Sequence, residues 1–126
     1  MSRPSPHELT IKLKEAEKAT LVGQVRLLEP DVILADLLDL GILADKLINV
    51  LSGLLHEINY RHYQGERPPK KSYENLIRGS ELFAFAWESA SMGCKMYFKF
   101  VLKMGVLWIV SLHQSRDKGG KTDEMP

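Results

Sequence analysis

Four polar residues near the C-terminus alternate with apolar residues between Lys95 and His113. Tyr97, Lys99, Ser111 and His113 offer a phenol, an ammonium, a hydroxyl and an imidazole. An imidazole changes protonation near neutral pH, which suits general acid or base work, and an ammonium can bind an anion. Because side chains of a strand alternate between the faces of a sheet, the spacing predicts that the four groups share one face.

The two strands that position these groups are predicted to form a β-hairpin. We expect a three-residue loop, Lys103-Met104-Gly105, with Gly105 in the left-handed conformation. A two-residue loop would shift the alternation and place Ser111 and His113 among the phenylalanines. With the longer loop, the opposite face is predicted to carry the apolar residues Met96, Phe98, Phe100, Leu102, Val106, Trp108, Val110 and Leu112.

The first half of the chain predicts three helices. A capping box with proline at the first helical position, Ser5-Pro6-His7-Glu8, begins a helix that ends near Leu21. A short extended segment at 24–28 precedes Glu29-Pro30-Asp31, which begins the second helix. A stripe of leucine and valine from 43 to 54 predicts a third helix that packs into the core.

The second half of the chain is predicted to be extended. Residues 58–63 and 82–88 alternate in hydrophobicity, and a polar loop, 64–80, separates them. Together with the hairpin, these segments predict an α+β fold with N-terminal helices packed on a largely antiparallel sheet that ends in a β-hairpin. We expect a single domain over residues 1–113 and a disordered C-terminal tail over 114–126.

The composition is typical of a cytoplasmic globular protein: 44% of the 126 residues are apolar, 26% are charged, and Cys94 is the single cysteine. Because residues 1–6 have no apolar core and residues 32–55 are interrupted by charges, we expect neither a signal peptide nor a membrane-spanning segment. Residues 1–57 hold six Lys/Arg against nine Asp/Glu, whereas 58–126 hold eleven against seven. A basic half that includes the predicted sheet favours a polyanionic ligand, although a solvated loop and tail would give the same imbalance.

Standard catalytic motifs are absent from the sequence. It has no glycine-rich phosphate loop, no G-x-S-x-G motif and no histidine pair spaced for zinc, so we expect neither a metal nor another cofactor. Cys94, His7 and His56 are more typical of structural or solvated positions than of catalytic ones.

Short motifs occur in a fixed order between Pro6 and His113: Pro6-His7, Gly23-Gln24-Val25-Arg26, Leu40-Gly41, Gly53-Leu54, Tyr60-Arg61, Glu81-Leu82-Phe83-Ala84-Phe85, Tyr97-Phe98-Lys99-Phe100 and Ile109-Val110-Ser111-Leu112-His113. In residues and in order they resemble the MqsR family of bacterial toxins, which are ribonucleases of the wider RelE-like group. Each motif is short, and the common order carries the resemblance.

The resemblance implies a RelE-like fold and the toxin of a bacterial type II toxin-antitoxin system. Such a toxin is an mRNA interferase, an endoribonuclease (a hydrolase) that cleaves single-stranded mRNA without a metal. A cognate antitoxin protein, expected to contain a helix-turn-helix, would neutralise it. Cleavage requires that the ribose 2′-hydroxyl loses a proton, that cations stabilise the phosphorane oxyanion and that the departing 5′-oxygen gains a proton.

At the positions that match the family, the resemblance assigns catalysis to Arg61, Tyr97 and His113. Arg61 stands where the family usually has lysine, and a guanidinium is suited to charge stabilisation rather than to proton abstraction. Tyr97 is expected in proton transfer or nucleotide binding, and His113 as general acid or base. The further candidates for RNA binding are Lys99, Arg67, Lys70, Lys71, Trp87 and Glu88.

Plainer interpretations remain open for these residues. Tyr97 can be a half-buried sheet tyrosine, Arg61 and Lys99 surface charges, and His113 the frayed end of a strand. For the whole chain, one alternative is a non-catalytic module of the same fold that binds RNA, a ribosome or a protein. The other is a structural protein whose polar sheet face is covered in a homo-oligomer.

Overall fold

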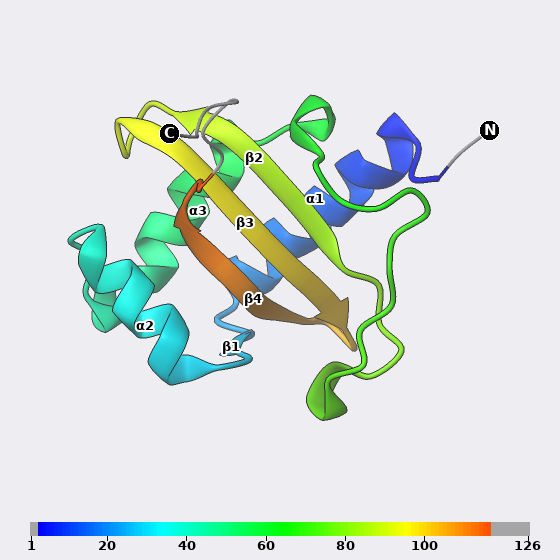
Figure 1. Ribbon diagram of the computed structural model, residues 1–126, viewed down its shortest axis with the longest axis horizontal. Helices are drawn as coiled ribbons and strands as arrows, with labels where there is room; N and C mark the ends of the chain where they lie inside the picture. Colours follow the sequence, from blue (N-terminus) through cyan, green and yellow to red (C-terminus); the bar gives the residue numbers. More distant parts are fainter. Residues whose placement is uncertain (1–2, 117–126) are drawn as a thin grey trace, which may run out of the picture.

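The computed structural model describes residues 3–116 and shows three α-helices packed against a four-stranded mixed sheet (Figure 1). The elements in chain order are α1 (Pro6–Leu21), β1 (Val25–Leu27), α2 (Pro30–Asp39), the 3-10 helix η1 (Ala44–Lys46), α3 (Leu47–Glu57), the 3-10 helices η2 (Tyr60–His62) and η3 (Asn75–Ile77), β2 (Phe83–Ser89), β3 (Cys94–Lys103) and β4 (Val106–Gln114).

The sheet has the strand order β1-β4-β3-β2, with β1 parallel to β4 and the other neighbours antiparallel. Helices α1 and α3 lie behind the sheet in Figure 1, and α2 lies beside β4. The helix-facing side of the strands supplies a dense aromatic core, in which Phe83, Phe85, Phe98 and Phe100 are at most 2% exposed. We call the opposite side the open face of the sheet.

The predicted starts of α1 and α2 are confirmed. At α1, the Ser5 side chain accepts a hydrogen bond from the Glu8 N–H at 3.1 Å, and Pro6 occupies a position where no intrahelical N–H bond is lost. Pro30 has the same position in α2. Gly23, with φ of 74°, then turns the chain from α1 towards β1.

The loop between β3 and β4 has two residues, so the predicted three-residue loop is wrong. Lys103 pairs with Val106, and both loop residues have positive φ, 53° for Met104 and 78° for Gly105. Such a turn matches the right-handed twist of the two strands, which makes it the favoured connection for a hairpin.

A β-bulge at Val110 compensates for the short loop. Lys99 pairs with Ser111, whereas the next residue, Phe100, pairs with Ile109. With the two-residue loop, Val106 and Trp108 pair with Lys103 and Val101 and lie on the open face instead of the predicted core face, and the extra residue at Val110 then reverses the alternation again. Leu107 and Ile109 are fully buried in their place, Leu112 is buried as predicted, and the polar residues beyond the bulge keep their predicted face.

Residues 58–63 do not form the predicted strand. Helix α3 continues past Gly53 to Glu57, and η2 follows it. The Asn59 side chain accepts from the Arg61 N–H at 2.9 Å, and the Asn59 N–H donates to Nδ1 of His62 at 3.0 Å. Burial lowers the pKa of the His62 imidazole, which agrees with its role as a hydrogen-bond acceptor. These local bonds explain why the alternating segment turns rather than extends.

The segment 64–82 covers one end of the open face. The Lys103 ammonium donates to the Leu76 carbonyl at 2.8 Å, and Ile77 and Val101 are fully buried although they lie outside the main core cluster. Val101 is on the same side of β3 as Lys99, because the two are two positions apart along the strand. The open face is therefore covered towards the hairpin loop, and it remains accessible around Tyr97 and Lys99.

Gln114 and Ser115, at the start of the expected tail, take part in the sheet. Strand β4 includes Gln114, and the Ser115 N–H donates to the Lys95 carbonyl at 2.8 Å. Residues 117–126 of the expected tail lie outside the described residues. Within residues 3–116, none of the helices combines the length and apolar character needed to cross a membrane.

Candidate active site on the open face

Tyr97 and His113 lie opposite each other on β3 and β4, on the open face as predicted. Their rings stack, with centroids 5.3 Å apart and planes inclined by 24°. Burial raises the pKa of the Tyr97 phenol. Tyr97 therefore keeps its proton at neutral pH and is suited to donate a hydrogen bond or a proton, not to act as a base.

Two contacts of His113 fit one tautomer of its ring. Its Nδ1 lies 2.8 Å from the Gln114 carbonyl oxygen, which can only accept, and its Nε2 lies 3.1 Å from Nη1 of Arg116, which can only donate. Both contacts are satisfied when the imidazole is neutral and carries its proton on Nδ1. The lone pair of Nε2, which would accept the proton if His113 were a general base, then points to Arg116.

A pocket of about 440 Å³ opens beside this pair. Its lining includes Gln64, Ala86, Tyr97, Ser111, His113 and Arg116. Gln64 belongs to the segment that runs along the edge of β2, and its backbone N–H donates to the Ala84 carbonyl at 2.7 Å. The pocket thus combines an imidazole, a phenol, a guanidinium, an amide and a hydroxyl, drawn from three separate stretches of chain.

A second, smaller pocket of about 210 Å³ continues the site along the open face. Gln64 and Tyr97 line both pockets, and the second adds Lys70 and Lys99. The two pockets therefore lie on either side of Tyr97. We call them together the groove. Cationic side chains stand at both ends of it, Arg116 at one and Lys99 with Lys70 at the other.

Arg61 does not stand on a neighbouring strand as predicted. It lies in η2, is exposed, and its guanidinium carbon is 5.6 Å from the centre of the Tyr60 ring. Among the described residues that line the groove, Arg116 and the two lysines supply the positive charge, and Arg61 is not one of them. Among the described residues, the cation in contact with the His113 ring is thus Arg116.

Trp87 cannot stack on a nucleotide in this structure. Its ring faces the helices, is 2% exposed, and donates from Nε1 to the Glu57 carboxylate at 2.9 Å. Ser89 Oγ and the Ser91 N–H donate to the same carboxylate at 2.7 and 2.9 Å. Trp87 therefore serves the junction between α3 and the β2–β3 turn rather than the groove.

Glu88 faces the open side of the sheet, where it is exposed and pairs in register with Lys95. It lies beyond the residues that line the groove. The expected role of Glu88 in RNA binding therefore has no pocket to support it.

The predicted basic loop divides into engaged and exposed cations. Arg67 lies 5.0 Å from the centre of the Tyr63 ring and donates to the Pro4 carbonyl at 3.1 Å. Lys71 is exposed, and its backbone forms an isolated antiparallel β-bridge with that of Glu81, whereas Lys70 lines the groove. Lys70 is thus the loop cation best placed for a ligand in the groove.

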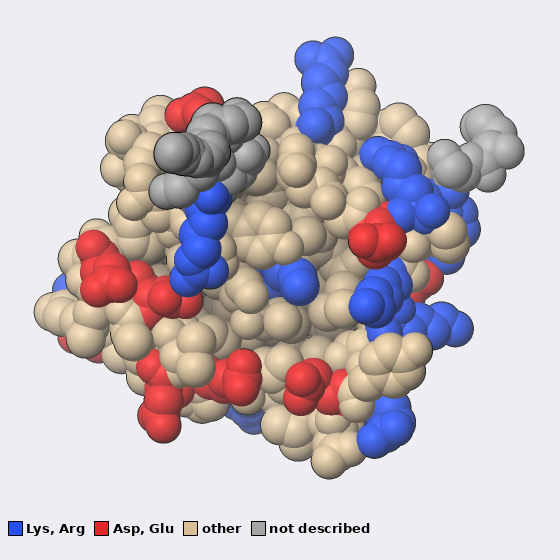
Figure 2. Space-filling view, viewed as in Figure 1, with Lys and Arg blue, Asp and Glu red and all other residues tan. Residues whose placement is uncertain are grey.

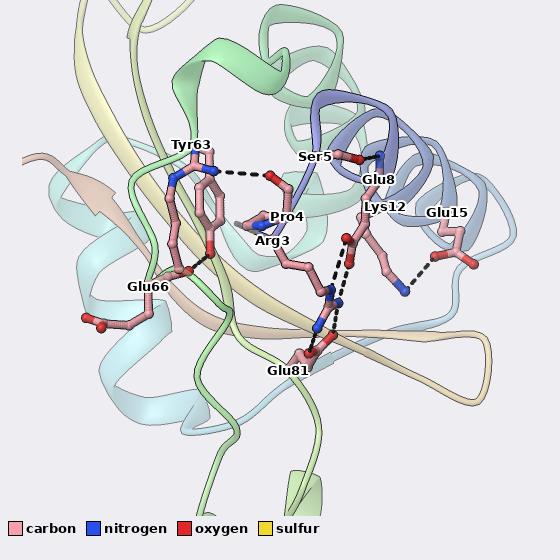
Figure 3. Close-up of polar contacts among 10 residues, drawn as sticks. Arg3, Pro4, Ser5, Glu8, Lys12, Glu15, Tyr63, Glu66 and Glu81 are labelled. Carbon is pink, nitrogen blue, oxygen red and sulfur yellow. Dashed lines mark hydrogen bonds and ion pairs between the residues drawn. The ribbon is translucent and has the colours of Figure 1, made fainter. Parts of the chain in front are cut away.

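The N-terminal segment is anchored close to this loop. Figure 3 shows the Arg3 guanidinium between the carboxylates of Glu8 and Glu81, and the Tyr63 hydroxyl donating to the Glu66 carbonyl. The hydrogen bond from Arg3 lowers the pKa of Glu81 against the opposing effect of burial. These contacts fix the edge of the sheet from which Gln64 and Lys70 reach the groove.

Charge is unevenly distributed on the viewed face. Figure 2 shows acidic side chains gathered over α2 and basic side chains gathered over the segment that precedes β2. The groove lies between these two regions, and its own titratable side chains are mainly basic. Across residues 3–116, no group of three His, Cys, Asp or Glu side chains is arranged to hold a metal ion.

Sequence reasoning missed Arg116 and Gln64. The sequence predicts Arg116 within the disordered tail 114–126 and Gln64 as the first residue of the polar loop 64–80. One signal was present for Arg116, since it follows His113 by three residues and a strand that ends at Gln114 leaves both side chains within reach. Gln64 gave no comparable signal.

Neither the models of known protein families nor the curated proteins gave a match to this chain. The functional assignment therefore depends on the geometry of the groove and on the resemblance of the sequence motifs.

Proposed function

We propose that this chain is a RelE-like, MqsR-like toxin that cleaves single-stranded mRNA without a metal. The observation that carries the proposal is the arrangement of Tyr97, His113 and Arg116 around one pocket of the open face. A neutral imidazole, a protonated phenol and a guanidinium are the three kinds of group that 2′-hydroxyl attack on a phosphodiester requires.

In the proposed mechanism, Nε2 of His113 takes the proton of the ribose 2′-hydroxyl. The 2′-oxygen attacks the adjacent phosphorus, and Arg116 and Lys99 stabilise the charge on the phosphorane oxygens. The bond to the 5′-oxygen then breaks, and this oxygen takes the Tyr97 proton. The products are a 2′,3′-cyclic phosphate and a 5′-hydroxyl. The phosphate-stabilising role expected of Arg61 passes to Arg116.

The proposal places the protein in the bacterial cytoplasm, with mRNA and a cognate antitoxin as partners. The antitoxin is expected to carry a helix-turn-helix. A small reading frame beside the gene for this chain, whose co-expression relieves growth arrest, would support this part of the proposal. Harmless overexpression of the chain alone would instead favour a structural protein.

A non-catalytic RNA-binding module is the second candidate, and one observation favours it. Arg116 already donates to the Nε2 lone pair of His113, so the atom needed as a base is occupied. Even with Nε2 occupied, a groove with cations at both ends would bind single-stranded RNA. Binding without scission is the result that separates this candidate from the nuclease.

The direct test is incubation of the purified chain with single-stranded RNA in the presence of EDTA. We expect cleavage, and we expect His113→Ala to reduce the rate by about 10²-fold or more, the usual contribution of a general base. Mass spectrometry of the fragments should find 2′,3′-cyclic phosphate ends. The exposed residue His7 in α1 provides a matched variant, His7→Ala, which should cleave like the wild type.

A further inference from the structure

Arg116 is shared between two partners on opposite sides. Its Nη1 lies 3.1 Å from Nε2 of His113, and its Nη2 lies 3.7 Å from the Asp36 carboxylate on α2. The Asp36 side chain is 20% exposed, whereas that of Arg116 is 71% exposed. The carboxylate is thus held by the helix, and the guanidinium is the partner that is free to move.

Space for such a movement exists on both sides of the guanidinium. Arg116 and His113 line the groove, and they also line a separate pocket of about 330 Å³ towards α2, where Asp36 and Asp39 are found. The guanidinium therefore stands at the boundary between an acidic pocket and the groove.

We propose that Asp36 competes internally with substrate phosphate for Arg116. In the free protein, Asp36 holds Arg116 across Nε2 of His113, and the base is blocked. A phosphodiester that enters the groove offers the guanidinium two oxygens in place of one carboxylate contact, so Arg116 turns to the phosphate and uncovers Nε2. The inference rests on the proposed function, because it assigns the phosphate-binding group of that site and explains how the base becomes available.

The chemistry of the exchange favours arginine. A guanidinium presents several N–H donors in one plane and binds phosphate through two parallel hydrogen bonds. The contact with Asp36 is longer and partly solvated, which makes it weak enough to be displaced. A shorter buried pair at this point would keep the site closed.

The test is a titration of the full-length, ¹⁵N-labelled chain with inorganic phosphate, followed by NMR of the His113 ring and the Arg116 side chain. Wild type should show the proton of His113 on Nδ1 before phosphate is added. Asp36→Asn should bind phosphate about two- to fivefold more tightly than wild type, the range that an exposed ion pair allows. Arg116→Ala should lose the phosphate-dependent shift of His113.

Asp39→Asn is the matched control, because Asp39 lines the same acidic pocket and the substitution removes the same charge as Asp36→Asn. The structure pairs Asp36, and not Asp39, with Arg116. A gain in phosphate affinity confined to Asp36→Asn supports the exchange. Equal gains in the two variants would overturn the exchange, because they would show that phosphate responds to the overall negative charge of the pocket. Unchanged phosphate binding in Arg116→Ala would overturn it as well.

Measurement of RNA cleavage on the same variants separates the exchange from the nuclease proposal. If phosphate binding responds as expected and no variant cleaves RNA, then the exchange stands and the nuclease proposal fails. If wild type cleaves RNA but Asp36→Asn and Asp39→Asn bind phosphate alike, then the nuclease proposal stands and the exchange fails.

Discussion

The imidazole of His113 stacks on the phenol ring of Tyr97 across two antiparallel strands, with 5.3 Å between the ring centres. The stack holds the two groups at a constant separation, because each ring limits the rotamers of the other. It also explains why Tyr97 is partly buried and why its pKa is raised. A phenol that gives a proton and an imidazole nitrogen that takes one are the pair that the proposed mechanism requires.

Two substitutions of Tyr97 separate its hydroxyl from its ring. Tyr97→Phe keeps the stack on His113 and removes the proton, so we expect single-turnover RNA cleavage to fall by about 10²-fold. RNA affinity, measured by fluorescence anisotropy, should stay within about threefold, because the stacking surface remains. Tyr97→Ala should lower both quantities. Equal cleavage by Tyr97→Phe and wild type would remove the phenol from the mechanism.

Glu57 is expected to be a strong determinant of stability. Burial acts to raise the pKa of its carboxyl, but hydrogen bonds from Trp87, Ser89 and Ser91 outweigh burial and lower the pKa to about 2. We expect Glu57→Gln to reduce the free energy of unfolding by about 1–3 kcal/mol at pH 7, allowing for partial exposure of the side chain. Glu88→Gln, an exposed change on the same strand as Trp87, should stay within about 0.5 kcal/mol.

The lowered pKa of Glu57 also predicts a pH dependence. The folded-state pKa lies below the ordinary value of 4.5, so the stabilisation is complete above about pH 5 and is lost as the pH falls towards 2. The difference in unfolding free energy between wild type and Glu57→Gln should therefore shrink over this range. Urea unfolding at several pH values measures it. A constant difference from pH 7 to pH 3 would show that the charge of Glu57 is not what stabilises the turn.

The parts of the fold that sequence predicts well are those fixed by local chemistry. Ser5 and Pro6 specify the start of α1 through a cap and a missing N–H, both of which act within one turn of helix. Residues 58–63 show the opposite case. Their alternation is typical of a strand, but bonds among Asn59, Arg61 and His62 stabilise a 3-10 turn.

The site itself was predicted in part, through two errors that cancel. The sequence predicts a loop one residue longer than the one found, and it does not predict the bulge at Val110. Each error reverses the alternation of β4, so Tyr97 and His113 were still placed on one face. The side that faces the helices depends on packing, which is why Trp87 was wrongly expected to be available. The spacing of Arg116 from His113 is visible in the sequence, but the tertiary contact of Arg116 with Asp36 of α2 is not.

The hairpin loop offers a direct test of its turn type. Met104 adopts a φ of 53° and is almost fully exposed, so its side chain contributes little packing in return for a strained backbone. Met104→Asn should raise the free energy of unfolding by about 0.5–1 kcal/mol, because Asn-Gly is a preferred pair in this turn. Met104→Val should lower it, since a β-branched residue is disfavoured at positive φ. Urea unfolding with an unchanged m-value is the measurement, and stabilisation by valine would contradict the turn.

Lys99 should contribute one phosphate contact to RNA binding. It lines the groove next to Tyr97. Lys103 lies four residues further along β3, on the same side of the strand, and donates to the Leu76 carbonyl of η3. Lys99→Gln should weaken binding of a single-stranded oligonucleotide and reduce the slope of log affinity against log salt by about 0.7, the value for one phosphate on a single strand. Lys103→Gln removes the same charge from the same strand and should leave that slope nearly unchanged. Equal reductions in both variants would mean that the RNA responds to the overall charge of the sheet, and that the groove does not direct its path.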